Sequence, residues 1–408
     1  QLALNGGPRL RNEPFCAWPV VGDEEVNAVA QVVRTGKWGH LFGKDGSKVE
    51  QFRNAFASYY RVDYAIPVTN GSVALEVALR NAGVGYGDEV ITPPTTWVAT
   101  NLAPVVVGAD PVFVDVLPDT YCIDPGRIEE AITPRTKAII PVHIGGYPCE
   151  MDRIMEIAGR HDLVVVEDVA QAHGTRIKGA LAGTFGHFGC FSFEISKLMT
   201  AGEGGMVITK ETSLGERVFG QCGEGGRQTD RMTRGRQNVG WNTRMTEMQA
   251  AILIAQLARL EEHRKKRIEN AAYLAKRLSE IDGIAPLKQD PEQNYYSYLF
   301  KYDAACFKGV PKNTFMAALE AEGIPLFSSP SHQPPAYRSP FFYSPRRDYA
   351  NVRCPVAEKA FEEEAVGFRA SGMLLGKRRD MDDIADAILK IQEHVEELPT
   401  QRPSTAGG

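Results

Sequence analysis

In the segment Phe191-Ser-Phe-Glu-Ile-Ser-Lys-Leu-Met-Thr-Ala-Gly-Glu-Gly-Gly205, a short apolar run leads to Lys197 and then to three glycines. An apolar, small-residue setting disfavours the charged form of the Lys197 amine and makes it a nucleophile. Such a lysine is suited to form a Schiff base with a carbonyl, and pyridoxal phosphate is a common carbonyl held in this way. Most lysines beside glycines are merely exposed, so the hypothesis needs three partners: a phosphate cradle, an acid for the pyridine nitrogen and an aromatic side chain for the ring.

The composition indicates an ordinary soluble protein. The 408 residues suffice for about two domains, and 43% hydrophobic and 24% charged residues are typical of soluble chains. A formal net charge of -5 provides no positive field for nucleic acid, so we expect no nucleic-acid partner. The one basic run, 264–267, follows two glutamates in a helical pattern, which predicts a solvated helix face.

The cysteine pattern and the length of the apolar runs are used to predict the cellular compartment. Seven cysteines are scattered, odd in number and never in a C-x-x-C pair. This argues against a disulfide framework or a zinc site and suits a reducing compartment. We see no apolar run of membrane-spanning length and no signal-peptide pattern, so we expect a cytoplasmic protein with no membrane partner.

From residue 64 onward, short β-branched runs alternate with helical patterns. This alternation predicts an α/β fold with a mostly parallel sheet covered by helices on both faces. In such folds ligands bind beyond the carboxyl ends of the strands. The expected strands are Tyr64–Val68, Glu89–Thr92, Pro111–Val116, Lys137–Val142, Leu163–Glu167, Gly189–Phe193 and Gly205–Thr209.

Shifts in composition divide the chain into four parts. An arm interrupted by glycine and proline precedes a large α/β domain, whose last helix is expected over 246–281. A smaller α+β domain follows, rich in aromatics and prolines, and the Pro/Ser/Thr/Gly end of the chain is expected to be a disordered tail. The expected ranges are 1–23 for the arm, 24–282 for the large domain, 283–398 for the small domain and 399–408 for the tail.

The candidate phosphate cradle is Val68-Thr-Asn-Gly-Ser72, which closes a strand and opens a helix. A helix N-terminus presents unpaired N–H groups and the positive end of the helix dipole, and Gly71 lets the backbone approach an anion closely. Ser72 adds a hydroxyl donor. The same residues also make a good turn and helix N-cap, so alone they are ambiguous.

The candidate acid is Asp168, at the carboxyl end of an apolar strand. A carboxylate beside a pyridine nitrogen keeps that nitrogen protonated, which makes the ring an electron sink. Gln171 follows three residues later and is placed to hydrogen-bond the ring hydroxyl. His173 is either a ligand contact or a structural histidine.

The candidate aromatic partner is Trp97, which follows the strand Glu89–Thr92. An aromatic face parallel to a pyridine gains stacking energy and sets the plane of the ring. A core tryptophan is the alternative.

These residues, in the order cradle, aromatic, strand-end aspartate and lysine, resemble one enzyme family. Residues 14–396 are similar to the fold-type I pyridoxal phosphate enzymes, and among them to the DegT/DnrJ/EryC1/StrS aminotransferases of sugar and aminocyclitol biosynthesis. The motifs that carry the resemblance are 69–72, 167–174, 192–205 and 240–252.

The resemblance implies a role for each ring contact. Lys197 is expected to be the Schiff-base lysine and the proton shuttle, with the cofactor alternating between pyridoxal 5'-phosphate and pyridoxamine 5'-phosphate. Asp168 is expected to hold the ring nitrogen, Gln171 the ring oxygen and Trp97 the ring face.

The resemblance also implies a shared site. Gly71, Ser72 and Ser192 are expected to contact the phosphate. Asn242 resembles the residue that reaches the phosphate of the neighbouring subunit, which implies a homodimer with shared active sites. A helix N-cap is a compatible structural role for Asn242.

The subgroup is indicated by the segments 119–125, 133–143 and 197–205. They resemble the glutamine-dependent scyllo-inosose and 2-deoxy-scyllo-inosose aminotransferases, and also 3-amino-5-hydroxybenzoate synthase. Glu194 departs from the pattern, because relatives often carry His or Gln there, beside the substrate. Other expected substrate-pocket residues, each with a structural alternative, are Trp38, Tyr295, Tyr296 and His332.

The expected reaction is amino transfer from L-glutamine or L-glutamate to a keto-cyclitol or keto-sugar, with Lys197 as general acid and base. The alternatives are a dehydrating, aromatising enzyme like the benzoate synthase and a nucleotide-sugar aminotransferase. The dehydratase branch of the family replaces the lysine with histidine, so Lys197 argues against it. A cofactor-binding regulator needs a DNA-binding domain, and the short segment before Glu24 predicts none. A nicotinamide enzyme needs a Gly-x-Gly-x-x-Gly turn, which is missing.

Overall fold

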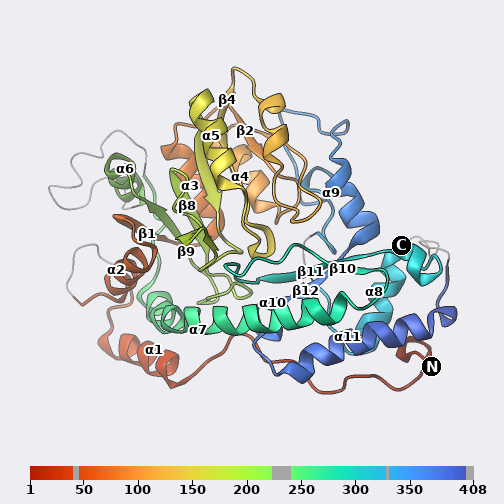
Figure 1. The fold of residues 1–408 in the computed structure, drawn as a ribbon. Helices are drawn as coiled ribbons and strands as arrows, with labels where there is room; N and C mark the ends of the chain where they lie inside the picture. Colours follow the sequence, from red (N-terminus) through yellow and green to blue (C-terminus); the bar gives the residue numbers. More distant parts are fainter. Residues whose placement is uncertain (40–45, 223–239, 328–329, 401–408) are drawn as a thin grey trace.

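The large sheet has seven strands in the order β1-β9-β8-β5-β4-β2-β3. The computed structural model describes residues 1–39, 46–222, 240–327 and 330–400 (Figure 1). Strand β9 is antiparallel to β1 and β8, and the remaining pairs of this sheet are parallel, so the mostly parallel sheet is confirmed. The strands are β1 (Tyr64–Val68), β2 (Glu89–Thr92), β3 (Asp110–Phe113), β4 (Thr136–Ile139), β5 (Val164–Asp168), β8 (Phe188–Ser192) and β9 (Gly205–Thr209).

Helices cover both faces of this sheet, because alternate residues of each strand point to opposite sides. In β9, Val207 packs in a cluster with α3 and α6, whereas Met206 and Ile208 pack in a cluster with α2 and α7. The helices of the first face are α3 (Gly71–Asn81), α4 (Ala99–Val107) and α6 (Thr212–Cys222), and those of the second are α2 (Lys48–Tyr60), α5 (Met151–His161) and α7 (Glu247–Leu278).

Two strands are shorter than the apolar runs that predicted them. The run 111–116 forms a strand only to Phe113, since Val116 leaves the sheet and makes an isolated bridge with Ile123. The run 137–142 ends as a strand at Ile139, although Val142 still bridges to Asp168. The sequence pattern cannot separate strand residues from the buried residues that follow them.

A second, antiparallel sheet lies beyond α7 in the sequence, in the order β10-β11-β12. Its residues share one hydrophobic core with the large sheet, because Ile139 of β4 and Phe300 of β11 belong to the same buried cluster. The boundaries between a large and a small domain stay a prediction, and most of the expected tail, 401–408, lies outside the described residues. The elements are β10 (Ile284–Pro286), β11 (Ser297–Tyr302), β12 (Ala365–Arg369), α8 (Lys312–Ala321), α9 (Pro355–Lys359), α10 (Ala370–Met373) and α11 (Arg378–Glu393). The hairpin β6 (Arg176–Ile177) and β7 (Ala180–Leu181) and helix α1 (Asp23–Thr35) complete the described strands and α-helices.

The N-terminal arm packs along the C-terminal helices (Figure 1). Leu2 is fully buried, and the backbone N–H groups of Ala3 and Leu10 donate to Glu322 beside α8. Arg11 forms ion pairs with two aspartates of α11. The N-terminal arm is therefore held by hydrogen bonds and ion pairs to the C-terminal part of the protein.

The predicted solvated face at 264–267 is wrong for Arg267. This side chain is fully buried in α7, where its Nε and Nη2 donate to the carbonyl oxygen of Ser371 at 3.0 and 2.8 Å. Its guanidinium also lies 5.1 Å from the ring of Trp18. The charge pattern led to a wrong prediction because α7 packs against α1, α2 and α11, and the Arg267 side chain lies on a packed part of the helix.

All seven cysteines are free thiols. Across the described helices, none is both long enough and apolar enough to cross a lipid bilayer.

Candidate active site

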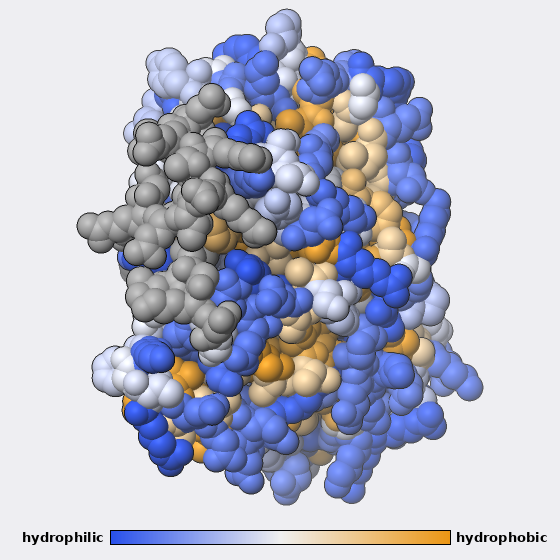
Figure 2. Space-filling model, turned by 90° about the vertical axis from the view of Figure 1, so that its left-hand side faces the viewer, coloured by the Kyte–Doolittle hydropathy of each residue, from blue (hydrophilic) through white to orange (hydrophobic). Residues whose placement is uncertain are grey.

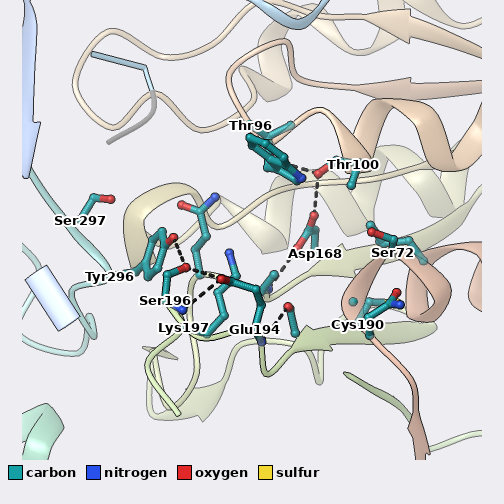
Figure 3. A pocket seen from close by; sticks show the side chains of 18 of the residues that line it. Ser72, Thr96, Thr100, Asp168, Cys190, Glu194, Ser196, Lys197, Tyr296 and Ser297 are labelled. Atoms are coloured by element: carbon teal, nitrogen blue, oxygen red, sulfur yellow. Dashed lines mark hydrogen bonds between the residues drawn. The ribbon is translucent and has the colours of Figure 1, made fainter. Parts of the chain in front are cut away.

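A cavity of about 530 Å³ opens at the carboxyl ends of β5 and β8. Figure 3 shows Ser72 and Tyr296 on opposite sides of it, with Asp168, Glu194 and Lys197 between them. The structure thus brings together many of the residues expected from sequence. Those that line the cavity are Gly71, Ser72, Trp97, Asp168, Gln171, Ser192, Glu194, Lys197 and Tyr296.

One end of the cavity is the N-terminus of α3. The side chain of Asn70 caps the helix by accepting from the N–H of Val73 at 2.9 Å. The N–H groups of Gly71 and Ser72 have no hydrogen-bond partner in the described part of the chain. A Cβ on Gly71 would lie 2.6 Å from the Cβ of Ser192, so glycine is needed for this close approach. The unpaired N–H groups beside two serine hydroxyls form an anion site.

Asp168 closes the floor of the cavity at the end of β5 and is 5% exposed. One carboxylate oxygen accepts from the hydroxyl of Thr100 at 2.8 Å, and the other accepts from the N–H of Ala170 at 3.0 Å (Figure 3). Burial raises the pKa of Asp168, while these two hydrogen bonds and the charge of Lys197 oppose the rise. A buried carboxylate of this kind favours a cationic N–H as its partner.

Glu167 and His143 support the strand end from the other face of the sheet. Both are fully buried, and His143 Nε2 lies 3.0 Å from Glu167 Oε2. His143 Nδ1 accepts from the N–H of Cys149, so Nε2 carries the proton and donates it to the carboxylate. Glu167 also accepts three backbone N–H bonds, from Gly183, Phe185 and Gly186. Sequence reasoning missed this pair, although the carboxylate stands next to Asp168.

Lys197 lies between β8 and β9, with Nζ 4.7 Å from the centre of the Tyr296 ring. Its expected apolar setting needs correction, since Asp168, Glu194 and Ser196 line the same cavity. The apolar run before Lys197 belongs to β8 and packs into the core, so its character does not extend to the lysine side chain.

Gln171 presents a hydrogen-bond donor to the cavity. Its Oε1 accepts from the N–H of Gly145 at 2.7 Å. This bond assigns the orientation of the amide and leaves the Nε2 group available to a ligand. Trp97 is 52% exposed and lines the cavity, so it is not a core tryptophan.

Three residues expected in the substrate pocket lie elsewhere. Tyr295 is 2% exposed, donates to Gln289 and packs on Tyr147, because successive residues of an extended chain point to opposite sides and only Tyr296 faces the cavity. Trp38 is half exposed and donates to a carbonyl of α1, away from the cavity lining. His332 is paired with Ser331, and its neighbour Gln333 lines the cavity instead.

Asn242 is exposed and lies outside the cavity formed by its own chain. Its role as N-cap of α7 is wrong, because Thr246 caps that helix by accepting from the N–H of Gln249. A contact with the phosphate of a neighbouring subunit stays a prediction. His173 is fully buried between Phe191 and Phe193, and burial lowers its pKa to about 3, which makes it a neutral core residue.

Sequence reasoning missed the residues that the second sheet and its loops bring to the cavity. Arg369, the last residue of β12, lies with its guanidinium 4.9 Å from the ring of Phe327. Arg369 forms no ion pair with any described residue. Phe327 and Gln333 also line the cavity. No local motif marks these positions, since each is far from Lys197 in the sequence.

Residues 19–392 match the model of the DegT/DnrJ/EryC1/StrS aminotransferase family. The chain belongs to this family. It is therefore an aminotransferase, and aminotransferases of this family depend on pyridoxal phosphate in general.

Known relatives cover nearly the whole chain. A Streptomyces kanamyceticus protein, named as a candidate L-glutamine:3-amino-2,3-dideoxy-scyllo-inosose aminotransferase, is 35% identical over 98% of both chains. The L-glutamine:2-deoxy-scyllo-inosose aminotransferase of Streptomyces fradiae is 37% identical over 98% of this chain and 99% of the relative. The crystal structure of 3-amino-5-hydroxybenzoic acid synthase is 33% identical with a TM-score of 0.83, over 93% of this chain and 100% of that one.

Proposed function

We propose that this family member is a pyridoxal-phosphate-dependent enzyme that transfers an amino group from L-glutamine to a keto-cyclitol. The names of the relatives from S. kanamyceticus and S. fradiae support this donor and this class of acceptor. The observation that carries the proposal is the arrangement of Lys197 and Asp168 in one cavity with an anion site at its end.

The residues of the cavity fit pyridoxal phosphate. The unpaired N–H groups at the start of α3 and the hydroxyls of Ser72 and Ser192 suit a phosphate. The buried carboxylate of Asp168 suits a protonated pyridine nitrogen, and the free amide N–H of Gln171 suits a ring oxygen. Trp97 offers an exposed aromatic face at the same cavity.

The bound cofactor supplies a carbonyl group for the amine and a ring that accepts the electron pair released when the donor loses its Cα proton. Lys197 Nζ is the general base that removes this proton and the general acid that returns a proton to the acceptor carbon. The hydrogen bonds from the Thr100 hydroxyl and the Ala170 N–H favour the ionised form of Asp168 and hold its side chain in place, where it would pair with a protonated ring nitrogen. His143 and Glu167 hold the end of β5 in place behind it.

Arg369 binds the carboxylate of the amino-acid donor in this proposal. It lines the cavity, and no described carboxylate pairs with its guanidinium. A planar guanidinium and a carboxylate form two parallel hydrogen bonds, which both hold and orient the donor. Stacking on Phe327 limits the rotamers available to Arg369 before the donor binds.

The proposal includes a homodimer with shared sites in the cytoplasm. The exposed position of Asn242 is compatible with a contact to a second subunit. Apolar side chains such as Val26, Val33 and Trp38 are about half exposed, and Figure 2 shows apolar patches between hydrophilic residues on the side of α1, α2 and α6. Such patches favour association with a partner surface.

A second candidate keeps the cofactor and changes the reaction. The likeness to the benzoate synthase structure, at 33% identity and a TM-score of 0.83, favours an enzyme that dehydrates and aromatises its substrate. A nucleotide-sugar acceptor is a further variant of the aminotransferase proposal.

The experiment is a spectral titration of the purified protein with pyridoxal phosphate bound. L-glutamine is expected to bleach the absorption band of the bound cofactor, and a keto-cyclitol is expected to restore it. Lys197→Ala is expected to remove the response, with Lys178→Ala, a surface lysine paired with Asp152, as control. A band that neither L-glutamine nor L-glutamate bleaches would favour the benzoate-synthase-like reaction instead.

A further inference from the structure

We propose that Glu194 recognises a positively charged amino group on the acceptor, so that this enzyme prefers an amino-bearing keto-cyclitol to a neutral one. The inference rests on the proposed aminotransferase function and narrows its acceptor class. It rests on the hydrogen bonding of the Glu194 carboxylate, of which one oxygen is held by Ser196 and the other is available to a ligand.

The Glu194 carboxylate is held in place on one side. Its Oε2 accepts from both the N–H and the hydroxyl of Ser196, the N–H at 3.1 Å. Ser196 is itself 5% exposed, and its hydroxyl lies 2.9 Å from that of Tyr296 (Figure 3). The hydroxyl of Ser371 donates to the Ser196 carbonyl oxygen at 2.9 Å. The carboxylate is thus oriented before any ligand arrives.

The other side of the carboxylate is unused. Within the ranges that the structure describes, Glu194 Oε1 accepts no hydrogen bond and no cation lies within ion-pair distance of either oxygen. A carboxylate can accept about four hydrogen bonds, so Oε1 retains capacity for a ligand. Glu194 is partly buried and lines the cavity, which places this capacity beside Lys197, where the acceptor carbonyl must lie.

A cationic ligand group suits this carboxylate better than a hydroxyl. An ammonium compensates the charge as well as the hydrogen-bonding capacity, and charge-assisted hydrogen bonds are about twice as strong as neutral ones. Among the described residues, the cations that line the cavity are Arg369 and Lys197, and both have other roles in the proposed function, because Arg369 binds the donor and Lys197 transfers protons.

Overall sequence identity to the relatives does not distinguish an amino-bearing acceptor from a neutral one. The S. kanamyceticus relative is named for an acceptor that carries an amino group, and the S. fradiae relative for one that does not, yet their identities to this chain are 35% and 37%. A residue inside the cavity has to separate the two acceptors, and Glu194 is the cavity carboxylate next to Lys197 that has spare acceptor capacity.

The test compares two acceptors with the same holoenzyme. The ratio of kcat/KM for 3-amino-2,3-dideoxy-scyllo-inosose to that for 2-deoxy-scyllo-inosose is expected to exceed one in the wild type. In Glu194→Gln, which keeps the shape and the Ser196 contacts, this ratio is expected to fall by about 10- to 100-fold. Glu203→Gln is the matched variant, since Glu203 lines the cavity from an exposed position, and its ratio is expected to change by less than about threefold.

Three outcomes overturn the inference: a wild type that prefers the neutral acceptor, a ratio unchanged in Glu194→Gln, or an equal loss of both acceptors in that variant. The acceptor assignment and the aminotransferase proposal can be tested separately. For the second, the response of the cofactor band to L-glutamine is recorded without any acceptor. If glutamine bleaches the band and the ratio does not move, only the acceptor assignment is wrong. If the band does not respond in the wild type, the aminotransferase proposal itself is wrong.

Discussion

The two ends of the cavity are built in different ways. At the cofactor end, Gly71, Asp168 and Ser192 lie where elements of one parallel sheet end, within motifs that can be read locally. At the other end, where the substrates are proposed to bind (the substrate end), Tyr296 precedes β11 and Arg369 ends β12, and they reach the cavity only because the second sheet packs beside the first. The residues proposed for the common chemistry are thus encoded in local motifs, as is Glu194, whereas Arg369 and Tyr296 reach the cavity through long-range packing.

The largest effect is expected at the cofactor end, from Lys197→Ala. Loss of the general acid and base should lower kcat by about 10⁴-fold, the upper end for proton-transfer groups. Steady-state kinetics with glutamine and a keto-cyclitol measure this, with Lys178→Ala as control. A loss below tenfold would show that Lys197 is not the general acid and base. The proposed chemistry would then not be located at the cofactor end of the cavity.

Asp168→Asn is expected to lower kcat by about 10²- to 10³-fold, because the amide cannot hold the ring nitrogen protonated. The fold should persist, since Asn can still accept from the N–H of Ala170. Thr100→Val, which removes only one hydrogen bond to Asp168, should cost less than Asp168→Asn. Equal losses in both variants would show that the charge of Asp168 is unimportant.

The Asp168→Asn variant should be more stable to unfolding than the wild type when no cofactor is bound. Burial raises the folded-state pKa of Asp168 above its unfolded value, so stability from this group is present at low pH and is lost as pH rises through the folded pKa. Cofactor-free Asp168→Asn should therefore melt about 1–3 °C above the wild type at pH 7, and the difference should shrink toward pH 4. A constant difference across this pH range would contradict the raised pKa.

At the substrate end, Arg369→Gln is expected to raise KM for glutamine by about 10- to 100-fold through loss of a charge-assisted contact with the donor carboxylate. Steady-state rates at varied glutamine concentration, with a saturating keto-cyclitol, measure this KM. Arg338→Gln is the control, because Arg338 pairs with Glu358 and Glu362 outside the cavity lining. An unchanged KM would place the donor carboxylate elsewhere.

The smallest effect is expected where the two ends meet. Ser371→Ala leaves the buried carbonyl oxygen of Ser196 without its donor and should cost about 1–3 kcal/mol of unfolding free energy. It should lower kcat/KM by less than about tenfold, by loosening Ser196 and hence Glu194. Ser279→Ala, at an exposed serine that donates to its own helix, should change stability by less than about 0.5 kcal/mol.

The tyrosine pair shows where sequence-based prediction stops. Tyr295 and Tyr296 have the same chemistry and adjacent positions, yet one is in the core and the other faces the cavity. The alternation of an extended chain predicts opposite sides, but the packing of the second sheet decides which side is the cavity. Arg267 gives the same lesson, since its charge predicts solvent and the packing of α7 buries it.

Hydrophobic period and strand-end motifs are local signals, so the sequence predicts the sheet, its mostly parallel character and, with the family resemblance, the candidate cofactor contacts. The three-dimensional packing is needed to learn that Arg369, Phe327 and Gln333 share a cavity with Lys197. It also shows that one oxygen of Glu194 accepts no hydrogen bond from the described residues. The physical reason is that a buried contact between distant segments depends on how two sheets pack, and no short stretch of sequence contains that information.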